Sequence, residues 1–259
     1  MSAPVERVAR RLRDAGCVFA EAEASLLLEA SSGEALEGLL ERRCAGEPLE
    51  HVLGWVELDG VRLSVGPGVF VPRQRTRLLA RLTRQAAAEV VGPVVELCCG
   101  VAPLAALLGD AGAGRELHVS DLDAVALEHA ARNVPRASVH RGDLFDALPT
   151  SLRGRIAVLA ANAPYVPTAS IAAMAPEARE HEPHRTLDGG DDGVDLHRRI
   201  AAGCPDWLAP GGVVLVETSR GQAQLTWTTF DDVGLDARVL TDDDLGATVV
   251  TAVAPRVLG

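Results

Sequence analysis

The sequence contains no lysine, one tyrosine and few aromatic residues of any kind. Its 25 basic residues are therefore all arginine, and 36 acidic residues bring the net charge to −11. Proteins that bind nucleic acid over a large surface neutralise many phosphates with cations, so this balance argues against a nucleic-acid-binding protein. Residues 11–16 and 73–84 are rich in arginine and could form local basic patches, although exposed helix faces explain them more simply.

Long apolar runs and paired cysteines are missing as well. No apolar segment approaches the roughly 20 residues that span a bilayer, and the N-terminus lacks the apolar core of a signal peptide. The cysteines have neither CxxC nor zinc-finger spacing, and the histidines show no HExxH or other ligand spacing. We therefore expect a soluble, cytoplasmic protein with reduced thiols, no membrane partner and no metal.

Two different apolar patterns divide the 259-residue chain. Residues 4–44 repeat apolar positions at helical spacing, which predicts two or three helices. Residues 55–65 alternate apolar and polar side chains around an Asp-Gly pair, a pattern typical of a β-hairpin, and residues 76–91 predict a linking helix. We expect a helical domain over residues 1–50, a hairpin and helix linker over 51–90, and a larger α/β domain over 91–259.

From residue 93 onward, short apolar runs alternate with helical stretches. The runs cover residues 94–98, 116–120, 138–140, 156–162, 211–218, 236–240 and 248–254. Strands separated by helices predict right-handed crossovers and a mostly parallel sheet, so the fold class is α/β with seven strands. The last two runs are joined by the short segment TDDDLGA, which predicts an antiparallel final pair. The loop-rich span 167–193 is long enough to indicate a functional role.

Small and acidic residues follow the first two runs, where ligands of open α/β sheets bind. Gly100 and Ala102 could form a turn that exposes backbone amides to an anion or carboxylate, although Cys98 stands where a first glycine would be expected and the full GxGxxG spacing is absent. Asp121, about 20 residues further on, could accept hydrogen bonds from two ribose hydroxyls. Asp123 is better explained as a helix cap.

The third and fourth runs add further polar residues at the same edge. Asp143 could accept a hydrogen bond from an adenine amine, so three successive strand ends favour an adenosine-type ligand. The fourth run ends in Asn162, Ala163, Pro164 and Tyr165. The Asn162 oxygen and a neighbouring carbonyl could accept both hydrogens of a planar NH2 group and orient it toward a methyl sulfonium. The prolines would stiffen the backbone and the tyrosine ring would provide a flat wall, whereas a simple Asn-Pro turn is the structural alternative.

The order of these motifs resembles the class I S-adenosylmethionine-dependent methyltransferases, and more specifically the HemK-type family of protein-glutamine N5-methyltransferases in an actinobacterial-style branch. The segment EPLEHVLGWVELDGVRLSVGPGVFVPR is similar to the hairpin linker of that family. EPHRTLDGGDDGVDLHRRI, LAPGGVVLVETSRGQ and GATVV follow in the family's order. The resemblance implies a Rossmann-like catalytic domain, S-adenosylmethionine as cofactor, and a protein substrate such as a release factor, methylated on a glutamine amide.

The resemblance also implies a role for each site residue. The implied cofactor site comprises Glu96, Cys98, Gly100, Ala102, Asp121, Leu122, Asp143, Leu144 and Asn162. Within it, the first strand and its loop would line the methionine part, Asp121 would hold the ribose, and Asp143 with Leu144 the adenine. The acceptor amide would contact the catalytic segment, which comprises Asn162, Ala163, Pro164 and Tyr165.

Several positions depart from the family pattern. Cys98 and Ala102 replace glycines of the cofactor loop, and Ala163 replaces the first proline of NPPY. Arg75 and Arg77 replace acidic residues of the linker motif PRxETE, and Ser219 replaces a glycine in the EIGxxQ-like segment ETSRGQ. Methyl transfer is still expected, and the acceptor stays open. The alternatives are a small-molecule or natural-product N-methyltransferase with an amine or amide acceptor, an adenine N6-methyltransferase acting on a flipped base, and a cofactor-binding regulator without catalysis.

Overall fold

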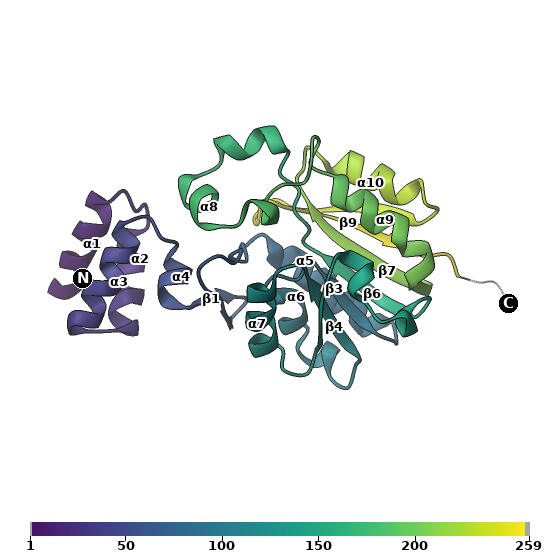
Figure 1. Cartoon of the computed structure of the whole chain (residues 1–259), viewed down its shortest axis with the longest axis horizontal. Coiled ribbons are helices and arrows are strands. Elements are labelled where there is room, and N and C mark those ends of the chain that lie inside the picture. The colour runs from purple at the N-terminus through teal and green to yellow at the C-terminus, as the bar shows by residue number, and fades with distance from the viewer. Residues whose placement is uncertain (1, 257–259) are drawn as a thin grey trace.

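The computed structural model describes residues 2–256, and its elements form three parts in chain order. In Figure 1 a helical bundle is joined through a small hairpin to a large sheet that carries helices on both faces. The expected α/β fold, with a helical N-terminal part and a hairpin linker, is confirmed. The domain boundaries at residues 50 and 90 stay predictions. Within residues 2–256, no helix has the length and apolar character needed to cross a membrane.

The N-terminal bundle has the three helices that the pattern over residues 4–44 allows, and a short fourth helix follows that range. They are α1 (Ala3–Asp14), α2 (Ala20–Ala30), α3 (Gly33–Cys44) and the short α4 (Leu49–Leu53). Leu12, Leu27 and Leu40, each from a different helix, are buried in a core that belongs to the bundle alone. Because each helix carries one apolar face, three such faces are enough to close a small core.

A buried ion pair ties this bundle together and links it to the rest of the chain. Nε of Arg43 in α3 lies 2.7 Å from Oε2 of Glu23 in α2, and each side chain is only 10% exposed. The same guanidinium lies 3.3 Å from Oε1 of Glu177, in α8 (Pro176–His181) of the larger part. Burial disfavours the charge of Arg43, but the two carboxylates outweigh it and raise the pKa of the guanidinium.

Replacing Arg43 by alanine should lower the free energy of unfolding by about 3 kcal/mol, because Glu23 would remain as an uncompensated buried charge. Arg11→Ala provides a matched control, since it breaks an exposed pair with Glu37 in the same bundle and should cost less than about 1 kcal/mol. Urea titration of both variants measures the difference. Equal effects would show that burial does not set the strength of the Arg43 contact.

The hairpin forms where the alternating pattern predicts it, from β1 (Trp55–Leu58) and β2 (Val61–Ser64). The turn residues Asp59 and Gly60 have φ angles of 52° and 77°. Both values are left-handed, as a two-residue turn requires if it is to follow the twist of its strands. An Asp-Gly pair adopts this conformation at low cost, which explains why the hairpin is visible in the sequence.

One asparagine fixes the hairpin beside the first loop of the large sheet. Oδ1 of Asn133, at the end of α7 (Ala124–Asn133), accepts a hydrogen bond from the Ser64 N–H at 2.7 Å. Its Nδ2 donates to the Val101 carbonyl at 2.8 Å. The linker and the loop that follows the first strand of the sheet are therefore held in a fixed relation.

The large sheet contains all seven predicted strands. They are β3 (Val94–Leu97), β4 (Leu117–Asp121), β5 (Ser138–Arg141), β6 (Ile156–Ala161), β7 (Leu208–Thr218), β8 (Asp236–Asp242) and β9 (Ala247–Val253). Their order is β5-β4-β3-β6-β7-β9-β8, and β9 runs antiparallel to both neighbours, as predicted for the final pair. The largest boundary difference is in β7, which begins at Leu208, whereas the sequence pattern begins this strand at residue 211.

Helices bury both faces of the sheet (Figure 1). One face is covered by α5 (Thr76–Glu89), α6 (Pro103–Ala106) and α7, and the other by α9 (Asp195–Trp207) and α10 (Ala223–Asp231). Neighbours in one strand, such as Val94 and Val95, belong to different cores. Strands buried on both faces read as continuous apolar runs, which is why they stand out in the sequence.

Strand order reverses between β3 and β6, and such a reversal opens a crevice at the carboxyl ends of the strands. The span 167–193 lies next to this crevice. It is more structured than expected, because it contains α8 and two short 3-10 turns over Thr168–Ala173 and His184–Thr186. The Val166 N–H donates to the Leu187 carbonyl at 3.0 Å. The later part of this span therefore lies against the loop that follows β6.

Candidate functional site

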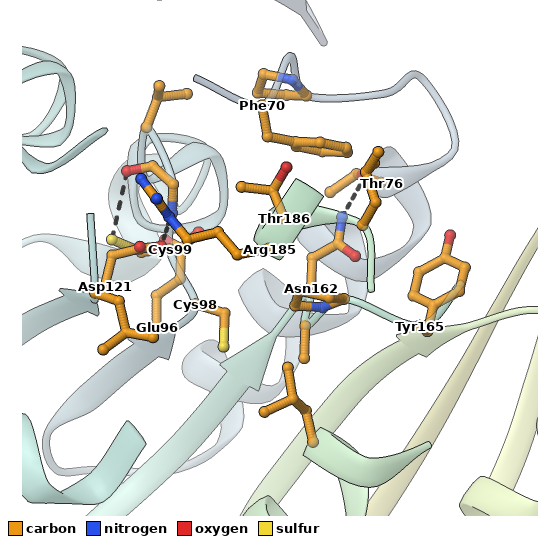
Figure 2. A pocket seen from close by; sticks show the side chains of 18 of the residues that line it. Phe70, Thr76, Glu96, Cys98, Cys99, Asp121, Asn162, Tyr165, Arg185 and Thr186 are labelled. Atoms are coloured by element: carbon orange, nitrogen blue, oxygen red, sulfur yellow. Dashed lines mark hydrogen bonds between the residues drawn. The ribbon is translucent and has the colours of Figure 1, made fainter. Parts of the chain in front are cut away.

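A cleft of about 1170 Å³ opens at the carboxyl ends of the central strands. This volume includes the open solvent at the mouth of the cleft. Figure 2 shows acidic and sulfur-containing side chains on one side of the cleft and Asn162 with Tyr165 on the other. Of the residues predicted from sequence, the lining includes Glu96, Cys98, Gly100, Asp121, Leu122, Asp143, Leu144, Asn162, Ala163, Pro164 and Tyr165.

Ala102 is the predicted residue that does not line the cleft. It is fully buried and precedes α6 with a φ of 60°. It therefore contributes to the backbone conformation of the loop and not to the cleft surface. Cys98 and Gly100 of the same loop have φ angles of 50° and 51°. Left-handed backbone costs a non-glycine residue about 1–2 kcal/mol, which gives a physical reason for the glycines that the family pattern has at positions 98 and 102.

The buried carboxylate of Glu96 anchors the helix that follows this loop. It accepts hydrogen bonds from the N–H groups of Ala105 at 2.7 Å and Leu104 at 3.2 Å. Burial raises the pKa of Glu96 to about 8, against the lowering effect of these two N–H groups. The two hydrogen bonds to Glu96 hold the start of α6 in place. This part of the cleft wall is where the methionine part of a cofactor is expected.

Asp121 connects the loops after β3 and β4. Its Oδ2 accepts from the Gly100 N–H at 2.8 Å and its Oδ1 from the Asp123 N–H at 2.9 Å. Each carboxylate oxygen has two acceptor positions, so lone pairs remain for further donors from the cleft. Burial raises the pKa of Asp121, and these backbone donors oppose the rise.

Asp143 and Leu144 lie at the end of β5. Oδ2 of Asp143 pairs with Arg199 of α9 at 2.7 Å, while 42% of the Asp143 side chain stays exposed. Leu144 is buried and left-handed, with a φ of 46°. Leu122, by contrast, is 55% exposed at the rim.

An arginine that was not predicted from the sequence lines the side of the cleft next to Asp121. Arg185 lines the cleft, and its guanidinium lies 2.6 Å from Oδ2 of Asp123. Asp123 also caps α7 through the Val125 N–H at 2.9 Å, as predicted. The pair therefore connects the span 167–193 to the loop after β4.

Asn162 and Tyr165 define the other side of the cleft, and each has a partner far away in sequence. Nδ2 of Asn162 donates to Oγ1 of Thr76 at 3.1 Å, the contact drawn in Figure 2. The Tyr165 hydroxyl donates to Oε1 of Glu217 at 3.0 Å. Nε of Arg75 lies 3.3 Å from that same oxygen, and its guanidinium carbon is 5.7 Å from the centre of the tyrosine ring.

The backbone behind Tyr165 is held by a glutamine and by glycines. Nε2 of Gln222 donates to the carbonyls of Tyr165 and Asp192, both at 2.8 Å. Gly193 passes so close that a Cβ there would collide with Gln222 Nε2 and the Tyr165 carbonyl, and its φ is 77°. The GGDDG sequence of the long span therefore permits a close backbone approach that fixes the tyrosine.

Gly193→Ala is expected to displace the Gln222 amide and weaken binding of the methyl acceptor, so that kcat/KM for the acceptor falls about tenfold or more. Cofactor affinity should stay within about threefold, since Gly193 lies behind the acceptor side. Gly221→Ala is the control, because a Cβ at Gly221 meets nothing within 4 Å. An unchanged kcat/KM in the Gly193 variant would contradict this role.

A buried histidine packs behind the same tyrosine. The rings of His197 and Tyr165 are 6.5 Å apart between centres, and Nδ1 of His197 lies 3.0 Å from Oγ1 of Thr226. Its Nε2 has no hydrogen-bond partner within residues 2–256. Burial lowers the pKa of His197 to about 4, so the ring is neutral at pH 7.

This lowered pKa predicts a loss of stability in acid. Between pH 6.5 and about 4 the unfolded chain binds a proton on His197 that the folded chain does not, so stability falls by up to about 1.4 kcal/mol per pH unit as the pH decreases. In His197→Gln this contribution is absent. Chemical denaturation of both proteins from pH 7 to 4.5 should therefore give a shallower decline for the variant, and parallel curves would refute the assignment.

Six further lining residues are direct chain neighbours of predicted ones: Cys99, Val101, Pro103, Ser120, Gly142 and Val166. The rest come from segments that sequence reasoning did not assign to the site. They are Phe70, Pro72, Arg73, Arg75 and Thr76 from the end of the linker, and Met174, Arg185, Thr186, Leu187 and Leu196 from the long span and α9. The motif PRQRTR and the length of the span were the available signals. Neither indicates which side chains face inward.

The fold is that of the class I methyltransferases. A solved structure shares it, namely a 16S rRNA methyltransferase of T. Thermophilus in complex with AdoMet and guanosine. It has a TM-score of 0.54 and 18% identity, and the match covers 77% of this chain and 49% of that one. At this identity the likeness concerns the fold alone.

Sequence relatives give the family. The chain is 36% identical to the release factor glutamine methyltransferase of Geobacter sulfurreducens over 77% of this chain and 70% of that protein. It is also 36% identical to the release factor glutamine methyltransferase of Streptomyces coelicolor over 76% and 72%. No protein-family model matches the chain. The chain belongs to the release factor glutamine methyltransferase family, and it is an S-adenosylmethionine-dependent N-methyltransferase.

Proposed function

We propose that the protein is a cytoplasmic enzyme that methylates the side-chain amide nitrogen of a glutamine in a release factor. Relatives that match most of the chain are named for this reaction. The observation that carries the proposal is the state of Asn162. This residue lines the cleft beside Tyr165, and its Nδ2 is engaged by Thr76, which leaves Oδ1 to accept a hydrogen bond from a substrate NH2 group.

The chemistry of the cofactor half fits S-adenosylmethionine. Asp121 keeps lone pairs for two ribose hydroxyls, Asp143 is exposed enough to accept from an adenine amine, and Leu144 offers an apolar contact. A Cβ built on Gly100 meets nothing within 4 Å, so the space above that backbone is open to a ligand. When bound, the cofactor supplies a methyl group on a positively charged sulfur.

The acceptor half compensates for the weak nucleophilicity of an amide. Oδ1 of Asn162 and the carbonyl of Ala163 would accept the two hydrogens of the NH2 group and aim its nitrogen at the methyl carbon. Tyr165 would stack on the planar amide. On accepting the methyl group, the amide nitrogen would give up one of its protons to solvent, and the cofactor would leave as a neutral thioether. Alignment in a polar, preorganised site would supply most of the rate.

Methyl-labelled S-adenosylmethionine tests this proposal. The protein is incubated separately with purified release factor, total nucleic acid and a small-molecule extract from the same cell. Label on one glutamine of the release factor is the expected result. Label confined to nucleic acid or to small molecules would overturn the proposed acceptor, and calorimetric cofactor binding without labelling of any fraction would favour a regulator.

Asn162→Ala should reduce kcat about 10³-fold or more, because the variant loses the oxygen that orients the substrate amide. Its dissociation constant for S-adenosylmethionine, measured by calorimetry, should stay within about threefold of the wild-type value. Retained turnover would refute the role of Asn162.

A further inference from the structure

The ring of Tyr165, the only tyrosine of the chain, must keep one orientation if it is to stack on a planar amide. A side chain of this kind has several staggered rotamers, and only one of them places the ring beside the acceptor. Gln222 holds the Tyr165 carbonyl, but a backbone contact does not select a rotamer. The ring of His197 packs 6.5 Å away between centres and forms no hydrogen bond with it. Contacts to the Tyr165 side chain itself must therefore fix the ring.

The hydroxyl at the tip of the ring is held by Glu217, near the end of β7. It donates to Oε1 of Glu217 at 3.0 Å, and the Glu217 side chain is only 1% exposed. A hydrogen bond to an ionised carboxylate is stronger than one between neutral groups. Because β7 is paired on both sides, with β6 and β9, the acceptor of this bond is carried by an interior strand of the sheet.

Arg75 contacts both the ring and the carboxylate that holds it. Its Nε lies 3.3 Å from Oε1 of Glu217, and its guanidinium carbon is 5.7 Å from the centre of the Tyr165 ring. A guanidinium within about 6 Å of a ring centre is attracted to the face of that ring. The arginine therefore favours the same position of the tyrosine as the hydrogen bond does.

These three side chains depend on one another. Both donors meet the same oxygen of Glu217, and Oε2 has no hydrogen-bond partner within residues 2–256. Burial raises the pKa of Glu217, whereas a positive charge next to a carboxylate favours its ionised form. Loss of either neighbour would leave a buried carboxylate with fewer donors, which is costly.

We infer that Arg75 and Glu217 are positioning residues for Tyr165 and hold its ring where the acceptor amide binds. This inference rests on the proposed function, because it concerns the acceptor half of that site. Neither residue has to touch the substrate. The inference also gives the arginine at position 75 a role. The acid that the family pattern has there would lie beside Glu217 and repel it.

The single tyrosine provides a measurement that does not depend on activity. Protein labelled with tyrosine that carries carbon-13 at Cζ should give one NMR signal, assigned by its loss in Tyr165→Phe. Glu217→Gln and Arg75→Met should each shift this signal, because each changes what the phenol contacts. Arg77→Met is the control, since Arg77 pairs with Asp59 of the hairpin turn, and it should leave the signal in place. An unmoved signal in Glu217→Gln or in Arg75→Met would overturn the inference.

Kinetics with the methyl acceptor test whether this arrangement serves the reaction. We expect kcat/KM for the acceptor to fall about tenfold in Glu217→Gln and in Tyr165→Phe, which keeps the ring but loses its hydroxyl. The double variant should fall no further than the weaker single variant, because both changes remove the same contact. Calorimetric affinity for S-adenosylmethionine should stay within about threefold in all three variants, which also shows that they are folded. Full additivity of the two changes would contradict the inference.

Position 75 allows a comparison of opposite charges. Arg75→Met should lower kcat/KM for the acceptor about tenfold, and Arg75→Glu should lower it about 100-fold, because a second carboxylate would adjoin Glu217. Arg77→Glu introduces the same charge at the other position that is acidic in the family pattern, and its kcat/KM should stay within about threefold of the wild-type value. An Arg75→Glu variant at least as active as Arg75→Met would refute the role of the arginine.

The two kinds of measurement separate this inference from the proposed function. If the wild-type protein does not label release factor, the proposed acceptor is wrong, while the carbon-13 signal still decides whether Arg75 and Glu217 hold the tyrosine. If release factor is labelled and the signal does not move in the variants, the inference fails and the proposed function stands.

Discussion

The acceptor half of the cleft depends on one buried carboxylate, that of Glu217. A carboxylate removed from water must find donors or lose its charge, and here the donors come from two distant segments: Arg75 from the linker and Tyr165 from the loop after β6. Meeting this one electrostatic requirement brings together residues that are up to 142 positions apart in the chain. The position of the Tyr165 ring in the cleft follows from it.

The arginines of the linker have a different meaning in three dimensions than in the sequence. In the sequence, the motif PRQRTR has arginine at two positions that are acidic in the family pattern, which indicates a local reversal of charge. In the folded chain Arg75 pairs with Glu217 and Arg77 pairs with Asp59 of the hairpin turn at 2.8 Å. Both substitutions of acidic residues are therefore balanced by acids within the same protein.

The sequence alone was sufficient to predict the sheet and those site residues that lie at the carboxyl ends of its strands. Apolar runs buried on both faces mark the strands, and the carboxyl ends of parallel strands must meet at one edge, so Asp121, Asp143 and Asn162 could be placed together. Ala102, predicted as a residue of the cofactor loop, is buried and does not line the cleft, because the sequence does not tell which residues of a tight loop turn inward. The contacts of Thr76, His197 and Arg185 were not predictable, since each depends on how separate segments pack.

The span that carries Arg185 has a mechanical consequence. Its residues 187–190 form backbone hydrogen bonds with residues 166–168, directly after Tyr165, while Arg185 reaches across to Asp123 on the cofactor side. One continuous segment thus touches the rim of both halves. A displacement of Arg185 away from Asp123 would therefore act on the backbone pairing next to the tyrosine, which links the two halves of the cleft through a single segment.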